Sequence, residues 1–175
     1  MLNTVFLMGY MGSGKTVVGK HLSNSTNYKF YDLDNFIELR ENKKVLDIFY
    51  DHNEVYFRKL ENKYLGFLSN KVEKKIISLG GGTPCFENNQ NIIQNTPDST
   101  SVYLKCSVEE LHKRLIAGKA KRPLISHLKS SIELKDFITK HLFERSFFYE
   151  KAKLKINTDD LEVFEISKQI ENILA

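Results

Sequence analysis

Two hydrophobic patterns alternate along the chain. Short apolar runs predict strands at residues 3–8, 29–33, 75–79, 100–104 and 154–157. Between them, apolar residues recur every three or four positions and predict helices at residues 15–25, 36–39, 45–50, 55–68, 108–115, 132–149 and 161–174. This alternation predicts a three-layer α/β fold, with about five mostly parallel strands and helices on both faces of the sheet. With no internal repeat and no linker, we expect a single domain spanning residues 1–175.

One segment follows neither pattern. Residues 117–131 are rich in lysine, contain Gly118 and Pro123, and have few apolar positions at regular spacing. Such a composition predicts a mobile loop, and we call residues 117–131 the lid segment.

Composition narrows the class of protein. The chain has 175 residues, of which 41% are hydrophobic and 27% charged, so a buried core is expected and global disorder is not. Its 26 Lys and Arg against 22 Asp and Glu give a net charge of +4. This mild excess suits small anionic ligands, although solvated surface lysines explain it equally well, and it does not suggest a nucleic-acid-binding protein.

The number of cysteines and the lengths of the apolar runs indicate in which cellular compartment the protein is expected. Cys85 and Cys106 are the only cysteines of the sequence, too few for a disulfide scaffold, which favours a reducing cytoplasm. The sequence has no apolar run of the ~18 residues that suggest a membrane span, and the polar sequence from Gly9 leaves no room for a signal peptide. We therefore expect a cytoplasmic protein that binds no membrane.

The strongest motif is the phosphate-binding loop GYMGSGKT at Gly9–Thr16, which fits G-x-x-x-x-G-K-[ST] and lies between a predicted strand and a predicted helix. Its glycines let backbone N–H groups turn toward phosphate oxygens, Lys15 can reach the β- and γ-phosphates, and Thr16 can bind Mg²⁺. The alternative is a glycine turn without a ligand. The residues expected to contact ATP here are Gly12, Ser13, Gly14, Lys15, Thr16 and Val17.

The remainder of the sequence distinguishes among phosphate-loop proteins. A switch GTPase would carry an N-K-x-D motif, and neither Asn42-Lys43 nor Asn62-Lys63 is followed by the required Asp. The chain is also small for a motor ATPase. A compact kinase for a small molecule remains.

A set of motifs in a fixed order narrows the class of kinase. The set comprises GYMGSGKT, Asp32-Leu33-Asp34, Phe57-Arg58-Lys59-Leu60-Glu61, Gly80-Gly81-Gly82, Lys121-Arg122-Pro123-Leu124, and Glu144-Arg145 followed by Tyr149-Glu150. In these motifs the chain resembles the shikimate kinase family almost end to end. The resemblance implies a monomeric phosphate-loop kinase with a mobile lid. It also implies that ATP and Mg²⁺ are used to phosphorylate the 3-hydroxyl of shikimate, giving shikimate 3-phosphate and ADP in aromatic amino acid biosynthesis.

Two aspartates end the second predicted strand. Asp32 and Asp34 are two positions apart, so both side chains are expected on one face at the carboxyl edge of the sheet, where ligands bind in open α/β sheets. The resemblance implies that Asp34 binds shikimate hydroxyls and accepts the proton of the attacking one, and that Asp32 helps Thr16 hold Mg²⁺. The alternative is an aspartate in a turn or at the N-cap of a helix beginning at Asn35.

Two arginines match the family's shikimate-binding positions. The planar guanidinium groups of Arg58 and Arg145 suit a carboxylate because each can donate two parallel hydrogen bonds. Alternatively, each pairs only with a neighbouring carboxylate at helical spacing: Glu54 or Glu61 for Arg58, and Glu144 or Glu150 for Arg145. Glu61 can also orient Arg58 toward the ligand.

The resemblance further implies that Phe49 and Phe57 form a wall against the substrate ring, although packing in the core explains these two residues as well.

Three glycines follow the third predicted strand. Gly80, Gly81 and Gly82 favour close approach of the backbone to a ligand over an ordinary turn, and by resemblance the Gly81 N–H binds substrate. The resemblance also implies that Arg122 in the lid segment closes over the ATP phosphates as a catalytic residue with Lys15 and Asp34, and that Arg114 stacks on adenine.

Two other functions remain open at this point. One is a kinase for another small polyol acid such as gluconate, which acceptor tests would distinguish. The other is a non-catalytic nucleotide-binding module, which would release no ADP when an acceptor is added.

Overall fold

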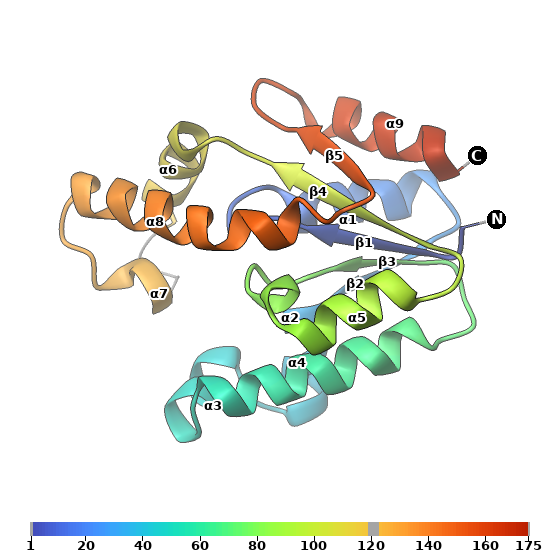
Figure 1. Cartoon of the computed structure of the whole chain (residues 1–175), viewed down its shortest axis with the longest axis horizontal. Helices are drawn as coiled ribbons and strands as arrows, with labels where there is room; N and C mark the ends of the chain where they lie inside the picture. The colour runs from blue at the N-terminus through green and yellow to red at the C-terminus, as the bar shows by residue number, and fades with distance from the viewer. Residues whose placement is uncertain (1, 119–122, 175) are drawn as a thin grey trace.

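A five-stranded parallel sheet lies at the centre of the protein (Figure 1). The computed structural model describes residues 2–118 and 123–174. The strands are β1 (Thr4–Met8), β2 (Lys29–Asp32), β3 (Lys75–Ser78), β4 (Ser99–Lys105) and β5 (Leu154–Asn157), in the order β2-β3-β1-β4-β5. The predicted sheet is confirmed, because each expected strand is present within one or two residues.

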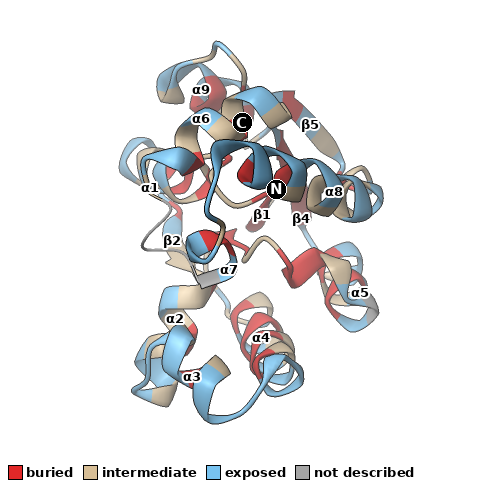
Figure 2. Cartoon of the chain, turned by 90° about the vertical axis from the view of Figure 1, so that its left-hand side faces the viewer, coloured by how far each residue is buried: buried red, intermediate tan, exposed pale blue. Residues whose placement is uncertain are grey.

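Helices cover both faces of this sheet. They are α1 (Lys15–Ser25), α2 (Leu33–Glu41), α3 (Val45–Asp51), α4 (Glu54–Ser69), α5 (Glu87–Asn95), α6 (Val108–Ile116), α7 (Pro123–Ser126), α8 (Ser131–Tyr149) and α9 (Val163–Leu174), with a 3₁₀ turn at Thr83–Cys85. In both views α2, α3 and α4 lie together at the opposite end of the molecule from α9 (Figures 1 and 2).

The core is divided by the sheet into two layers. Along β1, Phe6 and Met8 pack on the side of α4, α6 and α8, whereas Val5 and Leu7 pack against α1 and α9. Successive side chains of a strand point to opposite faces, so β1, which is buried at every position, must be covered on both.

Helix α5 is not predicted by the sequence pattern. Its sequence ENNQNIIQN is polar, and the helix turns two polar side chains, Asn89 and Gln90, into the interior beside Ile93. The Asn89 amide donates to the Thr83 carbonyl oxygen (3.0 Å) and accepts from the Asn62 amide (3.0 Å). Hydrogen bonds to other elements thus hold this helix in place. Because the side chains that make them are polar, the sequence of α5 shows no regular spacing of hydrophobic residues.

The end of β2 differs from the prediction. The strand stops at Asp32, and α2 begins at Leu33 rather than Asn35, with the Asp32 carboxylate accepting from the Asn35 N–H (3.3 Å) as its N-cap. The capping alternative is therefore confirmed for Asp32. Asp34 lies inside the first helical turn, so strand geometry is the wrong reason for placing the two carboxylates together.

The lid segment also differs from an irregular loop. Residues 123–126 form α7, and α8 already begins at Ser131 after a capping box between Ser130 and Glu133. Ile125 is fully buried in the core on the α8 side of the sheet, and this packing stabilises the short helix. Arg122 lies outside the described residues.

Within residues 2–118 and 123–174, no helix is long and apolar enough to cross a membrane.

Candidate active site

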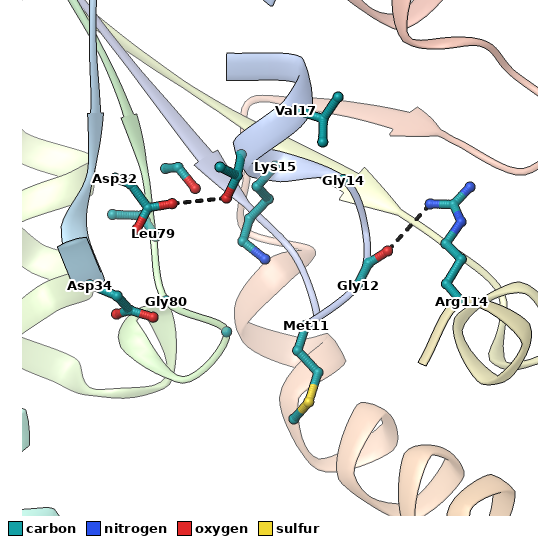
Figure 3. A pocket seen from close by; sticks show the side chains of 13 residues that line it. Met11, Gly12, Gly14, Lys15, Val17, Asp32, Asp34, Leu79, Gly80 and Arg114 are labelled. Carbon is teal, nitrogen blue, oxygen red and sulfur yellow. Dashed lines mark hydrogen bonds between the residues drawn. The ribbon is translucent and has the colours of Figure 1, made fainter. Parts of the chain in front are cut away.

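The phosphate loop connects β1 to α1, as predicted, and borders a cavity of about 350 Å³ at the carboxyl edge of the sheet (Figure 3). Lys15 is buried at the first position of α1, and its ammonium donates to the carbonyl oxygens of Gly9 (2.8 Å) and Tyr10 (2.9 Å). Figure 3 shows this side chain reaching into the space between the loop and the two aspartates. A cation placed there can meet the phosphates of a nucleotide.

Most of the predicted ATP-contacting residues lie on the wall of this first cavity. Gly12, Gly14, Lys15, Thr16 and Val17 line it, and Arg114 lies on the far side of the loop. Ser13 is not among the lining residues: its backbone N–H donates to Tyr10 (3.2 Å), and its side chain is buried.

Arg114 is held in place by two contacts. Its Nε donates to the Glu110 carboxylate (2.7 Å), and a terminal nitrogen donates to the Gly12 carbonyl oxygen (3.4 Å). The guanidinium therefore lies against the phosphate loop, at the edge of the first cavity. Arg122, the other arginine expected near ATP, lies outside the described residues.

Thr16 and Asp32 present oxygen atoms to the same space. The Thr16 hydroxyl donates to the Asp32 carboxylate (2.8 Å), and both residues line the first cavity. The described part of the chain contains no cluster of three or more His, Cys, Asp or Glu side chains that would enclose a metal ion. A hydroxyl and one carboxylate fit Mg²⁺, which usually takes few protein ligands and completes its shell with water and phosphate oxygens.

A second cavity, of about 540 Å³, lies next to the first. Both are lined by Met11, Asp34, Gly80 and Gly81. The other lining residues of the second cavity are Glu38, Lys44, Val45, Leu46, Phe49, Phe57, Arg58, Glu61, Gly82, Leu124 and Arg145. The structure therefore places most of the predicted phosphate-binding residues and the predicted acceptor-binding residues around two adjacent cavities, both of which Asp34 lines.

Asp34 has an unusual environment for a carboxylate. Its Oδ1 is buried and has no hydrogen-bond partner among the described residues. Burial, together with the nearby carboxylates of Glu61 and Asp32, raises the pKa of Asp34 to about 7. A carboxyl group with this pKa can exchange a proton with a ligand near neutral pH, as a general base must.

Arg58 faces the second cavity and pairs with both expected neighbours on α4. It donates to the carboxylates of Glu54 (2.8 Å) and Glu61 (2.6 Å), and its side chain is 14% exposed. Glu61 is fully buried and also accepts a hydrogen bond from the Thr83 hydroxyl. Arg58 thus makes both pairings that helical spacing predicts, yet it is not an exposed helix residue: the buried Glu61 holds its guanidinium at the cavity wall.

Close packing explains the first and third glycines of the triplet. A Cβ atom on Gly80 would come within 2.9 Å of the Glu61 carboxylate and the Thr83 hydroxyl, and one on Gly82 within 2.8 Å of the Arg58 guanidinium. Such distances are shorter than ordinary van der Waals contact, so any other residue would displace the charged groups. Gly80 and Gly82 thus leave room for the Glu61 and Arg58 side chains, which line the second cavity.

Arg145 enters the second cavity from α8. Its guanidinium lies 3.7 Å from the position that a Cβ on Gly81 would take. The expected alternative partner Glu150 pairs instead with Lys105 (2.8 Å) and Lys155 (3.1 Å). Arg145 and Arg58 therefore reach one cavity from two helices.

Apolar and charged residues complete the second cavity. Phe49 and Phe57 line it as predicted, with ring centroids 4.7 Å apart. Glu38 and Lys44 were not predicted: Glu38 accepts from the Lys44 ammonium (2.7 Å) and the Val45 N–H (3.0 Å) at the start of α3. The Thr83 hydroxyl was also missed. These polar contacts follow no short motif, so only the position of Thr83 directly after the glycine triplet could have drawn attention to it.

Comparisons with known proteins agree with one another. Residues 11–175 match the family model described as shikimate kinase. A shikimate kinase from Flavobacterium johnsoniae is 45% identical over 174 residues, covering 99% of this chain and 100% of that protein. The crystal structure of a shikimate kinase from Bacteroides thetaiotaomicron is 36% identical and superposes with a TM-score of 0.89, covering 98% of this chain and 97% of the other. The structure of a shikimate kinase from Acinetobacter baumannii in complex with shikimate is 27% identical with a TM-score of 0.86, covering 99% of this chain and 93% of the other.

Proposed function

This chain belongs to the shikimate kinase family, and we propose that it transfers the terminal phosphoryl group of ATP to the 3-hydroxyl of shikimate, releasing ADP and shikimate 3-phosphate. The observation that carries this proposal is that Asp34 lines two adjacent cavities, one bordered by the phosphate loop and the other by Arg58 and Arg145. A phosphoryl donor and a hydroxyl acceptor bound there would meet over one carboxylate.

On the donor side, the phosphate loop binds the phosphates and Lys15 turns from the loop carbonyls toward the γ-phosphate. Thr16 and Asp32 would hold Mg²⁺, which when bound neutralises phosphate charge. Arg114 at the loop's outer edge remains a predicted contact of adenine, and Arg122 remains a predicted phosphate contact from the lid segment. That the protein works as a cytoplasmic monomer also remains a prediction.

On the acceptor side, Arg58 and Arg145 bind the shikimate carboxylate, and the Gly81 N–H donates to the substrate. Phe49 and Phe57 supply an apolar wall for the ring. The side chains that surround the ring are thus apolar on one side and cationic where a carboxylate needs partners.

In the transfer step, Asp34 accepts the proton of the 3-hydroxyl as its oxygen attacks the γ-phosphorus. A bond forms between this oxygen and phosphorus while the bond from phosphorus to the β-phosphate oxygen breaks, and the electron pair leaves with ADP. Positioning and electrostatic stabilisation by Lys15 supply most of the acceleration, as is usual for phosphoryl transfer.

We expect activity to depend on the ionisation of Asp34. Its pKa, raised to about 7, leaves the carboxyl mostly protonated in more acidic solution, where it cannot accept a proton. kcat/KM for shikimate should therefore fall about tenfold per pH unit below about pH 7 and level off above it. A pH profile of initial rates measures this. A profile that stays flat down to about pH 5 would contradict the role of Asp34.

We expect Arg58→Lys and Arg145→Lys each to weaken shikimate binding. A lysine keeps the charge but loses the two parallel hydrogen bonds to the carboxylate, which should raise KM for shikimate about ten- to a hundredfold. KM for ATP should change by less than about twofold, since both arginines line the second cavity rather than the phosphate loop. Arg40→Lys, on the exposed face of α2, is the control. An unchanged KM for shikimate in both variants would refute the assignment of the carboxylate site.

The product identifies the reaction directly. Incubation with ATP, Mg²⁺ and shikimate should give one new phosphomonoester signal in ³¹P NMR, coupled to the proton on C3 of the ring. A phosphorylated product at another hydroxyl, or inorganic phosphate alone, would refute the proposal.

A further inference from the structure

Tyr10 occupies a position that the phosphate-loop pattern leaves open, yet it is only 1% exposed. Its hydroxyl is hydrogen-bonded to Nδ1 of His141 on α8, at 3.0 Å and 131 residues away in sequence. The two rings meet edge to face, with centroids 5.6 Å apart. A side chain of the phosphate loop is thus joined to the helix that carries Arg145.

Both groups of this contact are uncharged near neutral pH. Burial, helped by the nearby Arg145 guanidinium, lowers the pKa of His141 to about 4, and burial raises the pKa of Tyr10 above its usual range. The contact is therefore a hydrogen bond between a neutral phenol and a neutral imidazole. Its strength should vary little over the pH range in which the enzyme is assayed.

The spacing of residues along α8 relates the contact between Tyr10 and His141 to Arg145. His141, Arg145 and Tyr149 are each four residues apart, so they follow one another on one face of the helix. The Tyr149 hydroxyl donates to the Gly81 carbonyl oxygen in the glycine triplet (2.5 Å). Arg145 therefore lies between two points at which α8 is hydrogen-bonded to the site: Tyr10 in the phosphate loop and Gly81 beside the second cavity.

We propose that Tyr10 and His141 are positioning residues that hold Arg145 at a set place relative to the phosphate loop. Tyr10 suits this task because its backbone is held as well: the Tyr10 carbonyl oxygen accepts from Lys15 and from the Ser13 N–H. Arg145 then binds the acceptor carboxylate at a defined distance from the γ-phosphate, which in-line transfer requires. This role rests on the proposed function.

The test separates positioning from general stability. Tyr10→Phe keeps the ring and removes the hydroxyl, and it should raise KM for shikimate about fivefold, the effect of one neutral hydrogen bond. KM for ATP should stay within about twofold. Tyr28→Phe is the matched control, because Tyr28 is also buried and donates to the Leu2 carbonyl oxygen (2.5 Å) on the other side of the sheet. Tyr28→Phe should lose about as much thermal stability as Tyr10→Phe but should leave KM for shikimate and KM for ATP unchanged.

Variants of the partner complete the test. His141→Leu should raise KM for shikimate as Tyr10→Phe does, and the double variant should be no worse than either single one, because all remove one interaction. His141→Asn keeps a donor and an acceptor near the position of Nδ1 and should restore KM to within about twofold of the wild-type value.

Three results would overturn the positioning role: an unchanged KM for shikimate in Tyr10→Phe, equal increases in both KM values, or additive effects in the double variant. With an active wild-type enzyme, these results refute only the positioning role. A wild-type enzyme that shows no ADP release with shikimate refutes both the proposed function and this inference.

Discussion

Replacing Lys15 with methionine should lower kcat by about 10³-fold or more. The ammonium of Lys15 is the buried cation between the phosphate loop and the two aspartates, and methionine has similar length without charge. Lys20→Met is the matched control, because Lys20 is exposed on the same helix. Steady-state rates of both variants, together with thermal unfolding to verify that each is folded, make the comparison.

The methionine variant also loses the bonds from Lys15 to the Gly9 and Tyr10 carbonyl oxygens. Some loss of stability is therefore expected, and the comparison of rates is valid only below the unfolding transition of the variant. A folded Lys15→Met enzyme with kcat within tenfold of the wild-type value would contradict the assignment of Lys15 to the transferring phosphate.

Replacing Asp34 with asparagine should lower kcat by about 10²–10⁴-fold, because asparagine keeps the shape of the side chain and can still hydrogen-bond to shikimate but accepts no proton. KM for shikimate should change much less. The acidic limb of the pH profile should also disappear from the residual activity of the variant. An Asp34→Asn enzyme with a near-normal kcat would reduce Asp34 to a binding residue in the first turn of α2.

Stability provides an independent measurement on the same variant. A carboxyl group whose pKa rises from about 3.8 in the unfolded chain to about 7 in the folded protein binds its proton more tightly when folded. The wild-type protein should therefore lose stability as the pH rises between these values. Asp34→Asn should be more stable than the wild type at about pH 8 and should lose this advantage near pH 4. Urea unfolding at the two pH values measures the difference, and an Asn variant that is less stable at both would contradict the burial argument.

The parts of the site that depend on neighbouring residues were predictable from the sequence. The phosphate loop is one continuous segment, and its strand before and helix after show as clear hydrophobic patterns. The pairing of Arg58 with Glu54 and Glu61 follows from helical spacing alone.

The parts of the fold and the site that depend on polar contacts, or on contacts between residues distant in the sequence, were not predictable from the sequence. Helix α5 is held through Asn89 and Gln90, which produce no hydrophobic period. The bond from Thr83 to Glu61 and the contact of Tyr10 with His141 join residues far apart in sequence, and no motif marks them. The sequence predicts a loop in the lid segment because a single fully buried apolar residue, Ile125, produces no hydrophobic pattern.

In the proposed reaction the second cavity accepts shikimate as the phosphoryl acceptor. Coupled measurement of ADP release with ATP and Mg²⁺, in parallel with shikimate, with gluconate and without acceptor, tests it most directly. We predict rapid release with shikimate and only background release in the other two reactions. Equal rates with and without shikimate, or an equal rate with gluconate, would contradict the account.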